Sequence, residues 1–455
     1  MCGINLAYGE ETVKQMNTLL AHRGIRSTCT HLSNDLYLGH VRLPIQGLDP
    51  FYDHPFEYGN YLGAMVGEFY NYRTLDPDCN SDLPVFMEGY SRMQEGVFDH
   101  LEGMWAVILY DQLNGLVKIY TDYLAKKPLY IRTDMFAVSS EIKSLAEIGP
   151  ITFNERYFST VMKWGYCPEG FTPFKEIIKI LPGMEIIYSV KHSEILSMRY
   201  YTELVPRKDI NIRKALKESV KNRMVSDVPI ALLMSGGLDS TIIYYLMRQY
   251  CEEMTIFHVD NDEATFLEYI DFRPGDRIIQ LDSKDQRLDL YRILYHNDGP
   301  VDLGSLIPQY RLSQEIAKYG IQVCLSGDGA DELFGGYGRA QKYDSQYSDI
   351  YHELVYYHLP RLDKLMMMNT IELRCPFLAK GVIEGAMGLL WYPYRYGKRV
   401  LKNIFSDLVP NQIIVRDKKP LKSKPILEDS FEWRKELVYD YKSIYRKKGA
   451  KNERE

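Results

Sequence analysis

The second residue of the chain carries a thiol at a position where covalent chemistry is possible. If the initiator Met1 is removed, Cys2 becomes residue one and bears both a thiol and a free α-amine. An α-amine has a reference pKa of about 7.7 to 8.0, so it can take the proton of the thiol and return it to a leaving group. Cys2 is therefore a candidate nucleophile with its own base, although the dipeptide Met-Cys alone does not establish this role.

A glycine-rich turn in the second half of the chain could hold phosphates. Residues 235–240 read Ser-Gly-Gly-Leu-Asp-Ser and stand between the apolar run 230–234 and a helical pattern at 241–249. Two glycines allow close approach of the backbone, and the N–H groups of such a loop and of the helix start form a cradle for pyrophosphate. No Gly-Lys-Ser/Thr follows, so this is not a Walker A sequence and γ-phosphoryl transfer is not implied. The alternative is a purely structural turn.

A second turn, rich in glycine and acid, follows the apolar run 321–325. Residues 326–332 read Ser-Gly-Asp-Gly-Ala-Asp-Glu. Acids beside a polyphosphate loop suit Mg²⁺, which prefers oxygen ligands and bridges phosphates. We assign Asp239 and Asp331 to the metal and the pyrophosphate, with a solvated acidic turn as the alternative.

The elements that must position these residues follow two patterns. Up to about residue 200, short apolar runs between turn residues predict an antiparallel, sheet-rich domain with helices at 12–20 and 82–94. From about residue 211, strand, turn and helix patterns alternate, which indicates a parallel α/β sheet. The expected strands are 36–43, 62–66, 105–110, 116–121, 129–132, 184–189, 230–234, 255–259, 278–281 and 321–325.

The patterns also place the domain boundaries. From about residue 343 the chain is expected to be helical, with prolines at 360, 376, 393 and 410 as breaks. Residues 206–209, Pro-Arg-Lys-Asp, read as a linker. We therefore predict domains at 1–200 and 205–430 and a charged C-terminal tail at 431–455.

Composition excludes several classes of protein. With 55 basic and 61 acidic residues the net charge is −6, which gives no basic field for nucleic acid. Seven widely spaced cysteines without a C-x-x-C argue against a disulfide framework and a zinc site. His22, His258 and His296 stand in no ligand spacing and are interpreted as structural. No apolar run suits a membrane span and no leader pattern is seen, so we expect a cytoplasmic enzyme.

Short motifs in the first 145 residues resemble class II glutamine amidotransferases and occur in the same order. They are Met1-Cys2-Gly3-Ile4, His22-Arg23-Gly24, Gly39-His40-Val41-Arg42-Leu43, Gly67-Glu68-Phe69-Tyr70-Asn71-Tyr72, Ser81-Asp82 and Ser139-Ser140-Glu141-Ile142-Lys143-Ser144-Leu145. The resemblance implies an α+β, Ntn-hydrolase-type antiparallel sheet sandwich that binds glutamine with Arg42, Gly67, Glu68 and Asp82. Arg42 would hold the α-carboxylate, and the two acids the α-amine.

Two positions depart from that family. The family motif normally reads Asn-Gly-Glu, and its Asn donates to the oxyanion, but here the matching residue is Val66. Losing one oxyanion donor can cost about 10² to 10³ in rate. Glutamine hydrolysis is then slow, relies on another donor, or is vestigial with free ammonia used instead. The Pro-Asp that usually follows His-Arg-Gly is replaced by Ile25-Arg26.

The second half resembles the ATP pyrophosphatase domain of asparagine synthetases, and the whole resemblance runs from residue 2 to about 426. It implies an adenine nucleotide alpha hydrolase-like sheet, ATP with Mg²⁺, and cleavage between the α and β phosphates. The residues implied at the nucleotide are Leu233, Ser235, Gly236, Gly237, Asp239, Ser240, Val259, Ser326 and Gly327. Asp328 matches an acid that assists the acyl-adenylate chemistry. Lys418, or Lys419 if the register shifts by one, matches a lysine that stabilises the transferring phosphates.

The expected reaction is that of a glutamine-hydrolysing asparagine synthetase. Cys2 would release ammonia from glutamine, ATP would adenylate the side-chain carboxylate of aspartate, and ammonia would displace AMP. The alternatives are a different carboxylate acceptor, an ammonia-dependent enzyme, and a non-catalytic sensor of nucleotide or glutamine. A homodimer is expected by analogy with the family.

Overall fold

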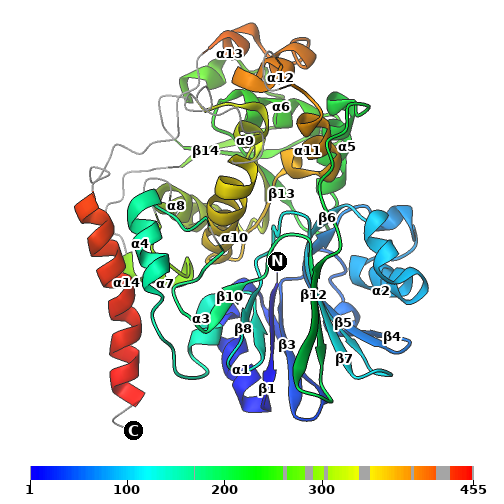
Figure 1. The fold of residues 1–455 in the computed structure, drawn as a ribbon. Helices are drawn as coiled ribbons and strands as arrows, with labels where there is room; N and C mark the ends of the chain where they lie inside the picture. The colour runs from blue at the N-terminus through cyan, green and yellow to red at the C-terminus, as the bar shows by residue number, and fades with distance from the viewer. Residues whose placement is uncertain are drawn as a thin grey trace.

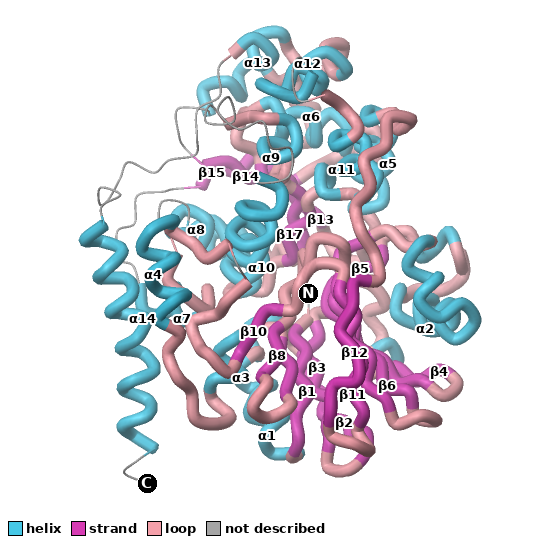
Figure 2. Tube along the Cα trace, in the orientation of Figure 1, coloured by secondary structure: helices cyan, strands magenta, loops and turns pink. Residues whose placement is uncertain are grey.

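Two six-stranded antiparallel sheets make up the first part of the chain (Figures 1 and 2). In the computed structural model, the described residues are 2–168, 170–259, 264–281, 290–301, 306–337, 349–390, 394–416 and 431–452. The first sheet has the order β10-β8-β9-β1-β3-β2, with bounds Ile177–Lys179, Tyr130–Arg132, Ala137–Ser139, Gly3–Tyr8, Leu36–Arg42 and Arg26–Ser33. The second has the order β12-β11-β7-β6-β5-β4, with bounds Glu194–Tyr200, Met184–Ser189, Leu116–Thr121, Gly103–Asp111, Tyr61–Phe69 and Phe56–Tyr58.

An apolar core fills the space between these two sheets. Ile4 and Leu6 of β1 belong to one buried cluster with Ala64 and Val66 of β5 and Ile108 of β6. Ile4 and Leu6 are two residues apart on β1, as are Ala64 and Val66 on β5, so each of these strands has one apolar face that points into the core. α1 (Glu10–Leu19) contacts β1 and β3, and α2 (Asp82–Met93) contacts β4 and β5. Helices therefore pack on both sheets, against β1, which begins directly after Cys2, and against β5, which carries Glu68 near its end.

A parallel five-stranded sheet organises the second part. Its order is β15-β14-β13-β16-β17, with bounds Arg277–Leu281, Thr255–Val259, Ile230–Leu233, Val323–Leu325 and Glu372–Arg374. The helices of this part are α5 (Ile212–Arg223), α6 (Leu238–Met247), α7 (Leu290–His296), α8 (Leu306–Ala317), α9 (Ala330–Phe334), α10 (Leu359–Met367), α11 (Lys380–Met387), α12 (Arg399–Ile404) and α13 (Asn411–Val415). The chain proceeds outward from β13 to β15 and then returns to the other side of β13 with β16. Ligands of open parallel sheets bind at such a reversal, at the carboxyl ends of the strands.

The fold class expected from the sequence is confirmed: antiparallel sheets come first, a parallel sheet follows, and helices dominate the end. The strands expected at 116–121, 184–189 and 255–259 have these bounds in the structure. The prediction of a purely helical segment after residue 343 is wrong at β17, which pairs with β16. Three residues are too few to show a two-residue period, and Pro376 directly after the strand suggested only a helix break.

The C-terminal helix α14 (Phe431–Asn452) lies alongside α4 (Glu155–Trp164) and α7 (Figure 1). Leu437, Tyr441 and Tyr445 on α14 are buried, in one apolar cluster with Phe158 of α4. This helix occupies most of the segment that the sequence marked as a charged tail. No helix among the described residues is long and apolar enough to cross a membrane.

Candidate functional site

Cys2 lies buried directly before β1. Burial raises the pKa of its thiol, while a hydrogen bond from the backbone of Leu43 and the charge of Arg42 act in the opposite direction. The Cys2 carbonyl oxygen accepts a hydrogen bond from Arg23 Nε at 3.0 Å. The backbone around this residue is therefore fixed by a neighbouring guanidinium, and the thiol lies next to a backbone donor.

Arg42, Glu68 and Asp82, which the sequence predicts at one site, come from three different elements. Arg42 ends β3, and its Nη2 donates to the carbonyl oxygens of Gln46 and Gly47 at 2.9 and 2.7 Å. Glu68 on β5 accepts a hydrogen bond from Gln46 Nε2. The loop after Arg42 thus joins the cation to the acid, as recognition of an amino acid's two charged ends requires.

The two acids are buried close together. Burial raises the pKa of Glu68 well above its usual value, and the negative charges of Glu372 and Asp82 raise it further. Burial also raises the pKa of Asp82 to about 6, although its Oδ2 accepts from the Phe69 backbone N–H at 2.8 Å. A bound ammonium group would relieve this repulsion, so the pair favours a cationic ligand.

Gly67 is required by the backbone at this point. Its φ is 116°, and a Cβ atom there would meet the Met104 carbonyl oxygen at 1.9 Å. Neither condition suits an L side chain. Val66, directly before it, is buried in the same apolar cluster as Cys2. The residue that replaces the expected oxyanion donor is therefore an apolar side chain in the core between the two sheets.

The turn after β13 is stabilised by hydrogen bonds between its serines and its own backbone. Ser240 Oγ accepts from the Ser235 backbone N–H and donates to the Gly237 carbonyl oxygen, both at 3.2 Å. Gly236 has a φ of 78°, in the left-handed region that favours glycine. Since α6 begins at Leu238, the turn leads straight into a helix N-terminus, the arrangement expected for a phosphate cradle.

The acidic turn after β16 packs onto this cradle. A Cβ atom at Gly327 would lie 2.8 Å from Asp239 Cβ and 3.0 Å from the Ser240 backbone nitrogen, so only glycine permits this approach. Ser326 Oγ donates to Asp328 Oδ2 at 2.7 Å, which holds that carboxylate at the strand end. The structure therefore brings together the two turns that the sequence predicts at one site.

Asp239 and Asp331 meet at a third residue, Lys398, whose Nζ pairs with both carboxylates. Lys398 has a φ of 58°, unusual for a lysine and typical of residues held in place at functional sites. Asp239 Oδ1 is buried and has no hydrogen-bond partner among the described residues. The sequence interpretation missed a role for Lys398; the Gly-Lys pair at 397–398 was the available signal.

Of the remaining predicted positions, the structure describes Leu233 and Val259 but not Lys418 and Lys419. Leu233 ends β13 and Val259 ends β14, two neighbouring parallel strands, so both lie at the edge of the sheet where the cradle lies. Lys418 and Lys419 lie outside the described residues.

Comparison with known families matches both parts of the chain. Residues 1–201 match the model of a glutamine amidotransferase domain, and residues 211–347 and 343–443 match the model of asparagine synthase. The chain belongs to the asparagine synthase family.

Several curated members of the asparagine synthase family are similar along most of this chain. Asparagine synthetase B, glutamine-hydrolysing, of Escherichia coli is 26% identical over 452 residues, which cover 89% of this chain and 77% of that protein. The glutamine-hydrolysing asparagine synthetase 1 of Bacillus subtilis is 28% identical over 360 residues, covering 72% of this chain and 56% of that protein. A Methanocaldococcus jannaschii relative is 29% identical over 393 residues, with coverage of 74% and 76%.

A buried ion-pair network joins the two parts of this asparagine synthase family member. Arg23 Nη1 donates to Glu141 Oε1 at 2.7 Å, and Arg23 Nη2 donates to Asp363 Oδ2 at 2.8 Å on α10. Lys127 Nζ donates to the other oxygen of Asp363 at 3.1 Å. Because Arg23 also contacts the backbone of Cys2, the position of α10 is linked to the thiol through one side chain.

This network predicts a large stability loss for Asp363→Asn. Both Arg23 and Lys127 would lose a shared carboxylate in a buried environment, and breaking such a pair costs about 3–5 kcal/mol. The urea denaturation midpoint should fall clearly. Asp407→Asn, at the half-exposed pair with Arg213, is the control and should change stability by less than about 1 kcal/mol. Equal effects of the two variants would contradict the network's importance.

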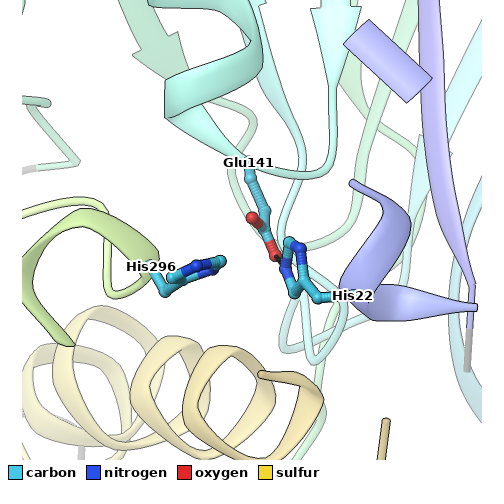
Figure 3. Close-up of side chains that lie close together, drawn as sticks. All are labelled: His22, Glu141 and His296. Carbon is cyan, nitrogen blue, oxygen red and sulfur yellow. Dashed lines mark hydrogen bonds and ion pairs between the residues drawn. The ribbon is translucent and has the colours of Figure 1, made fainter. Parts of the chain in front are cut away.

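His22, Glu141 and His296 also meet at this junction (Figure 3). His22 Nε2 lies 3.0 Å from Glu141 Oε1, and the two imidazole rings are 4.5 Å apart. Their spacing in the sequence does not predict this cluster. Although the ligand types suit a metal ion, Arg23 and Lys143 already pair with Glu141. Burial and these two cations lower the pKa of His22 well below its usual value, so the site disfavours further positive charge.

A small cavity of about 20 Å³ is lined by residues from both parts of the chain. Tyr70, two residues after Glu68, and Cys375, whose Sγ is 3.7 Å from Ser326 Oγ, both line it. A water molecule needs roughly 10–15 Å³, so the cavity has room for one molecule of that size. Lys126, Lys127 and Arg223 add positive charge to the lining.

Proposed function

We propose that this protein is a glutamine-hydrolysing asparagine synthetase. Residues 1–200 would form its glutaminase domain and residues 205–430 its ATP-dependent synthetase domain. The observation that supports the proposal most is that the turns 235–240 and 326–332 pack together at the reversal point of the parallel sheet, with Asp239 and Asp331 both paired to Lys398. All seven cysteines are free thiols, which suits a reducing compartment such as the cytoplasm.

In the first site, Cys2 attacks the side-chain amide of glutamine. Arg42 binds the α-carboxylate of this substrate, and Glu68 and Asp82 bind its α-amine. Release of Met1 places the α-amine of Cys2 beside its own thiol, so that this amine takes the thiol proton and gives it to the departing ammonia. The resulting thioester is hydrolysed to glutamate.

In the second site, the turn 235–240 binds the pyrophosphate portion of ATP. The residues present fit Mg²⁺: Asp239 and Asp331 converge, and Asp239 offers a buried oxygen without a partner. When bound, Mg²⁺ would neutralise charge on the phosphate oxygens. Lys398, which lies between the two acids, would contact the β and γ phosphates. Asp328 would face the reacting carboxylate. Leu233 and Val259 would contact the adenine nucleoside. Lys418 is proposed to contact the phosphates as well.

Ammonia must pass from the first site to the second, and the cavity lining favours its neutral form. Burial lowers the pKa of Lys126 to about 8, and Lys127 and Arg223 also line the cavity; its acidic lining residue, Asp363, is paired with Lys127 at 3.1 Å, so the basic residues are in excess among the described lining residues. Such a lining repels ammonium but not ammonia, so nitrogen would arrive unprotonated and able to attack the adenylate. AMP then leaves, and aspartate becomes asparagine.

The test is ATP-dependent asparagine formation from aspartate, run with glutamine and with ammonium as separate nitrogen sources. Asparagine, AMP and pyrophosphate should form in equal amounts with either source, and glutamate should match asparagine only with glutamine. Pyrophosphate without asparagine would redirect the search to other carboxylate acceptors. Absence of pyrophosphate with all acceptors would favour the sensor interpretation and overturn the proposal.

A second candidate, an ammonia-dependent enzyme with weak glutaminase activity, is favoured by Val66. Val66 stands at the sequence position where the family has the donor Asn, and it is buried in an apolar cluster. Under this candidate, ammonium supports asparagine formation far better than glutamine does.

Val66→Asn should therefore raise glutaminase activity. Restoring one oxyanion donor is worth up to about 10²-fold in kcat, while burying the amide should cost stability by about 1–3 kcal/mol. Glutamate release measures the first effect and urea denaturation the second. Val66→Thr adds a polar group of similar size without the amide and serves as control. An unchanged kcat in Val66→Asn would show that another donor, such as the Leu43 backbone N–H, already serves the oxyanion.

A further inference from the structure

A second cavity between the two parts lies on the other side of α10. Its volume is about 60 Å³, enough for several water molecules or a small organic ion. Leu362 and Asp363 of α10 line the first cavity, whereas Arg361 and Lys364 line the second. No described residue lines both cavities, so the second is separate from the proposed ammonia path and from both reaction sites.

Lys179, the last residue of β10, is buried in the wall of this cavity. Its Nζ donates to the Val355 carbonyl oxygen at 2.6 Å and lies 5.2 Å from the centre of the Tyr356 ring. Within the described part of the chain, no carboxylate pairs with this ammonium. Burial, together with the positive charge of Lys364, lowers the pKa of Lys179 to about 7. A buried lysine without a counter-charge is costly and rare in structural cores.

The other charged groups of the wall do not supply the missing anion. Asp298 is paired with Lys364 at 2.8 Å and accepts from the backbone N–H groups of Ile142 and Lys143 at 2.9 and 3.1 Å. Arg361 adds a further cation to the lining. Among the described residues that line the cavity, Lys179, Lys364 and Arg361 are basic and Asp298 is the acidic one, and Asp298 is paired with Lys364.

We propose that this cavity is a binding site for a small oxyanion, a carboxylate or a phosphate, that neutralises Lys179 and bridges the two parts of the chain. Tyr157 and Phe171 give the site aromatic walls, which suit a compact ligand with a short apolar portion. Lys179 and Tyr157 belong to the N-terminal part, and Arg361 and Lys364 belong to α10. An occupant would thus hold α10 against the N-terminal part.

The test is isothermal titration of the full-length protein with sodium acetate, sodium succinate and inorganic phosphate at constant ionic strength. At least one anion should bind with millimolar affinity or better, and binding should weaken at least about tenfold in Lys179→Met. Binding by the carboxylates alone or by phosphate alone would each support the site and would identify its ligand class. Absence of binding by all three anions would overturn the proposal.

Two variants separate this site from other anion sites on the protein. Lys163→Met removes an exposed lysine of α4 and should leave the binding unchanged. Lys398→Met removes the cation of the proposed nucleotide site. If the heat of binding disappears in Lys398→Met and persists in Lys179→Met, the anion occupies the nucleotide site and the proposal fails. Thermal melting of each variant checks folding, and Lys179→Met should melt no lower than the wild type because it removes an uncompensated buried charge.

The pH dependence of succinate binding provides a second readout that does not depend on the folding of a variant. Lys179 must be protonated to bind an anion, so its pKa of about 7 predicts that affinity falls roughly 30-fold between about pH 6 and 8.5. The titratable or charged groups that line the cavity with it, among the described residues, are Lys364, Asp298, Arg361, Tyr130, Tyr157, Cys167, Tyr356 and Tyr357, with His358 in contact with Arg361.

Most of these neighbours keep one charge state across that range. The pKa of Asp298 is lowered, and those of Lys364, Tyr157 and Tyr356 are raised. Affinity that does not change with pH in the wild type would contradict a role for the Lys179 ammonium. A pH dependence that persists in Lys179→Met would assign the titration to a group other than Lys179 and would also overturn the proposal.

Discussion

Cys2→Ala should lose glutamine-dependent asparagine formation by at least about 10³-fold while it keeps the ammonium-dependent reaction. The thiol is the only nucleophile proposed in the first site, and removing it leaves the ATP site untouched. Cys2 is buried, so alanine leaves a small void and removes the thiol as partner of the Leu43 backbone donor, changes that are confined to the first site. Parallel assays of asparagine and glutamate with the two nitrogen sources measure the effect.

The matched control for this variant is Cys29→Ala, a half-buried cysteine on β2 outside both sites. It should retain both activities. If Cys2→Ala also loses the ammonium reaction, the change has disturbed the contact from Arg23 to the Cys2 backbone, and the assignment of a separate nucleophile is not supported. If glutamine remains a good nitrogen donor in Cys2→Ala, another group performs the hydrolysis.

Asp331→Asn should abolish asparagine formation from both nitrogen sources. Asp331 and Asp239 approach the same Lys398 ammonium from the first turns of α9 and α6. Losing a carboxylate that holds Mg²⁺ removes several kcal/mol of charge stabilisation, which corresponds to at least about 10²-fold in rate. Pyrophosphate release with aspartate and ATP is the measurement, and glutamine hydrolysis without ATP should persist.

Asp209→Asn, at the exposed pair with Arg207, controls for the loss of one negative charge and should have full activity. Lys398→Met would leave the two carboxylates facing each other without their cation, so it should weaken ATP binding as well. Normal pyrophosphate release by Asp331→Asn would remove the second site from the proposal. The glutaminase assay then shows whether the first site stands alone.

Local sequence patterns were sufficient to predict much of the fold. The alternation along 116–121 and 184–189, and the apolar runs at 230–234 and 255–259, each predict a strand that the structure contains, because side-chain period and burial are local properties. The same reasoning fails at β17, which has three residues and pairs with β16, a strand distant in the sequence.

The sequence also gave the candidate site its main members, but not all of them. The turns at 235–240 and 326–332 could be predicted to meet, since the carboxyl ends of adjacent parallel strands share one edge. Lys398 could not be placed there, because its approach to Asp239 spans more than a hundred residues of chain and depends on how α12 packs on α9. The sequence showed that Val66 departs from the family's Asn-Gly-Glu motif. That Val66 is buried in the same apolar cluster as Cys2 follows only from the packing of the two sheets.

The sequence by itself determined the kinds of chemistry available: a terminal thiol, a phosphate-binding turn and paired acids, each fixed by residue type and local spacing. Only the tertiary structure decided which charges meet across the junction of the two parts. Arg23, Glu141, Asp363 and Lys127 form one buried network there, while Lys179 pairs with no carboxylate of the described residues. The reason is physical: ion pairing and desolvation depend on distances in space, and residues far apart in the chain carry no local pattern that records them.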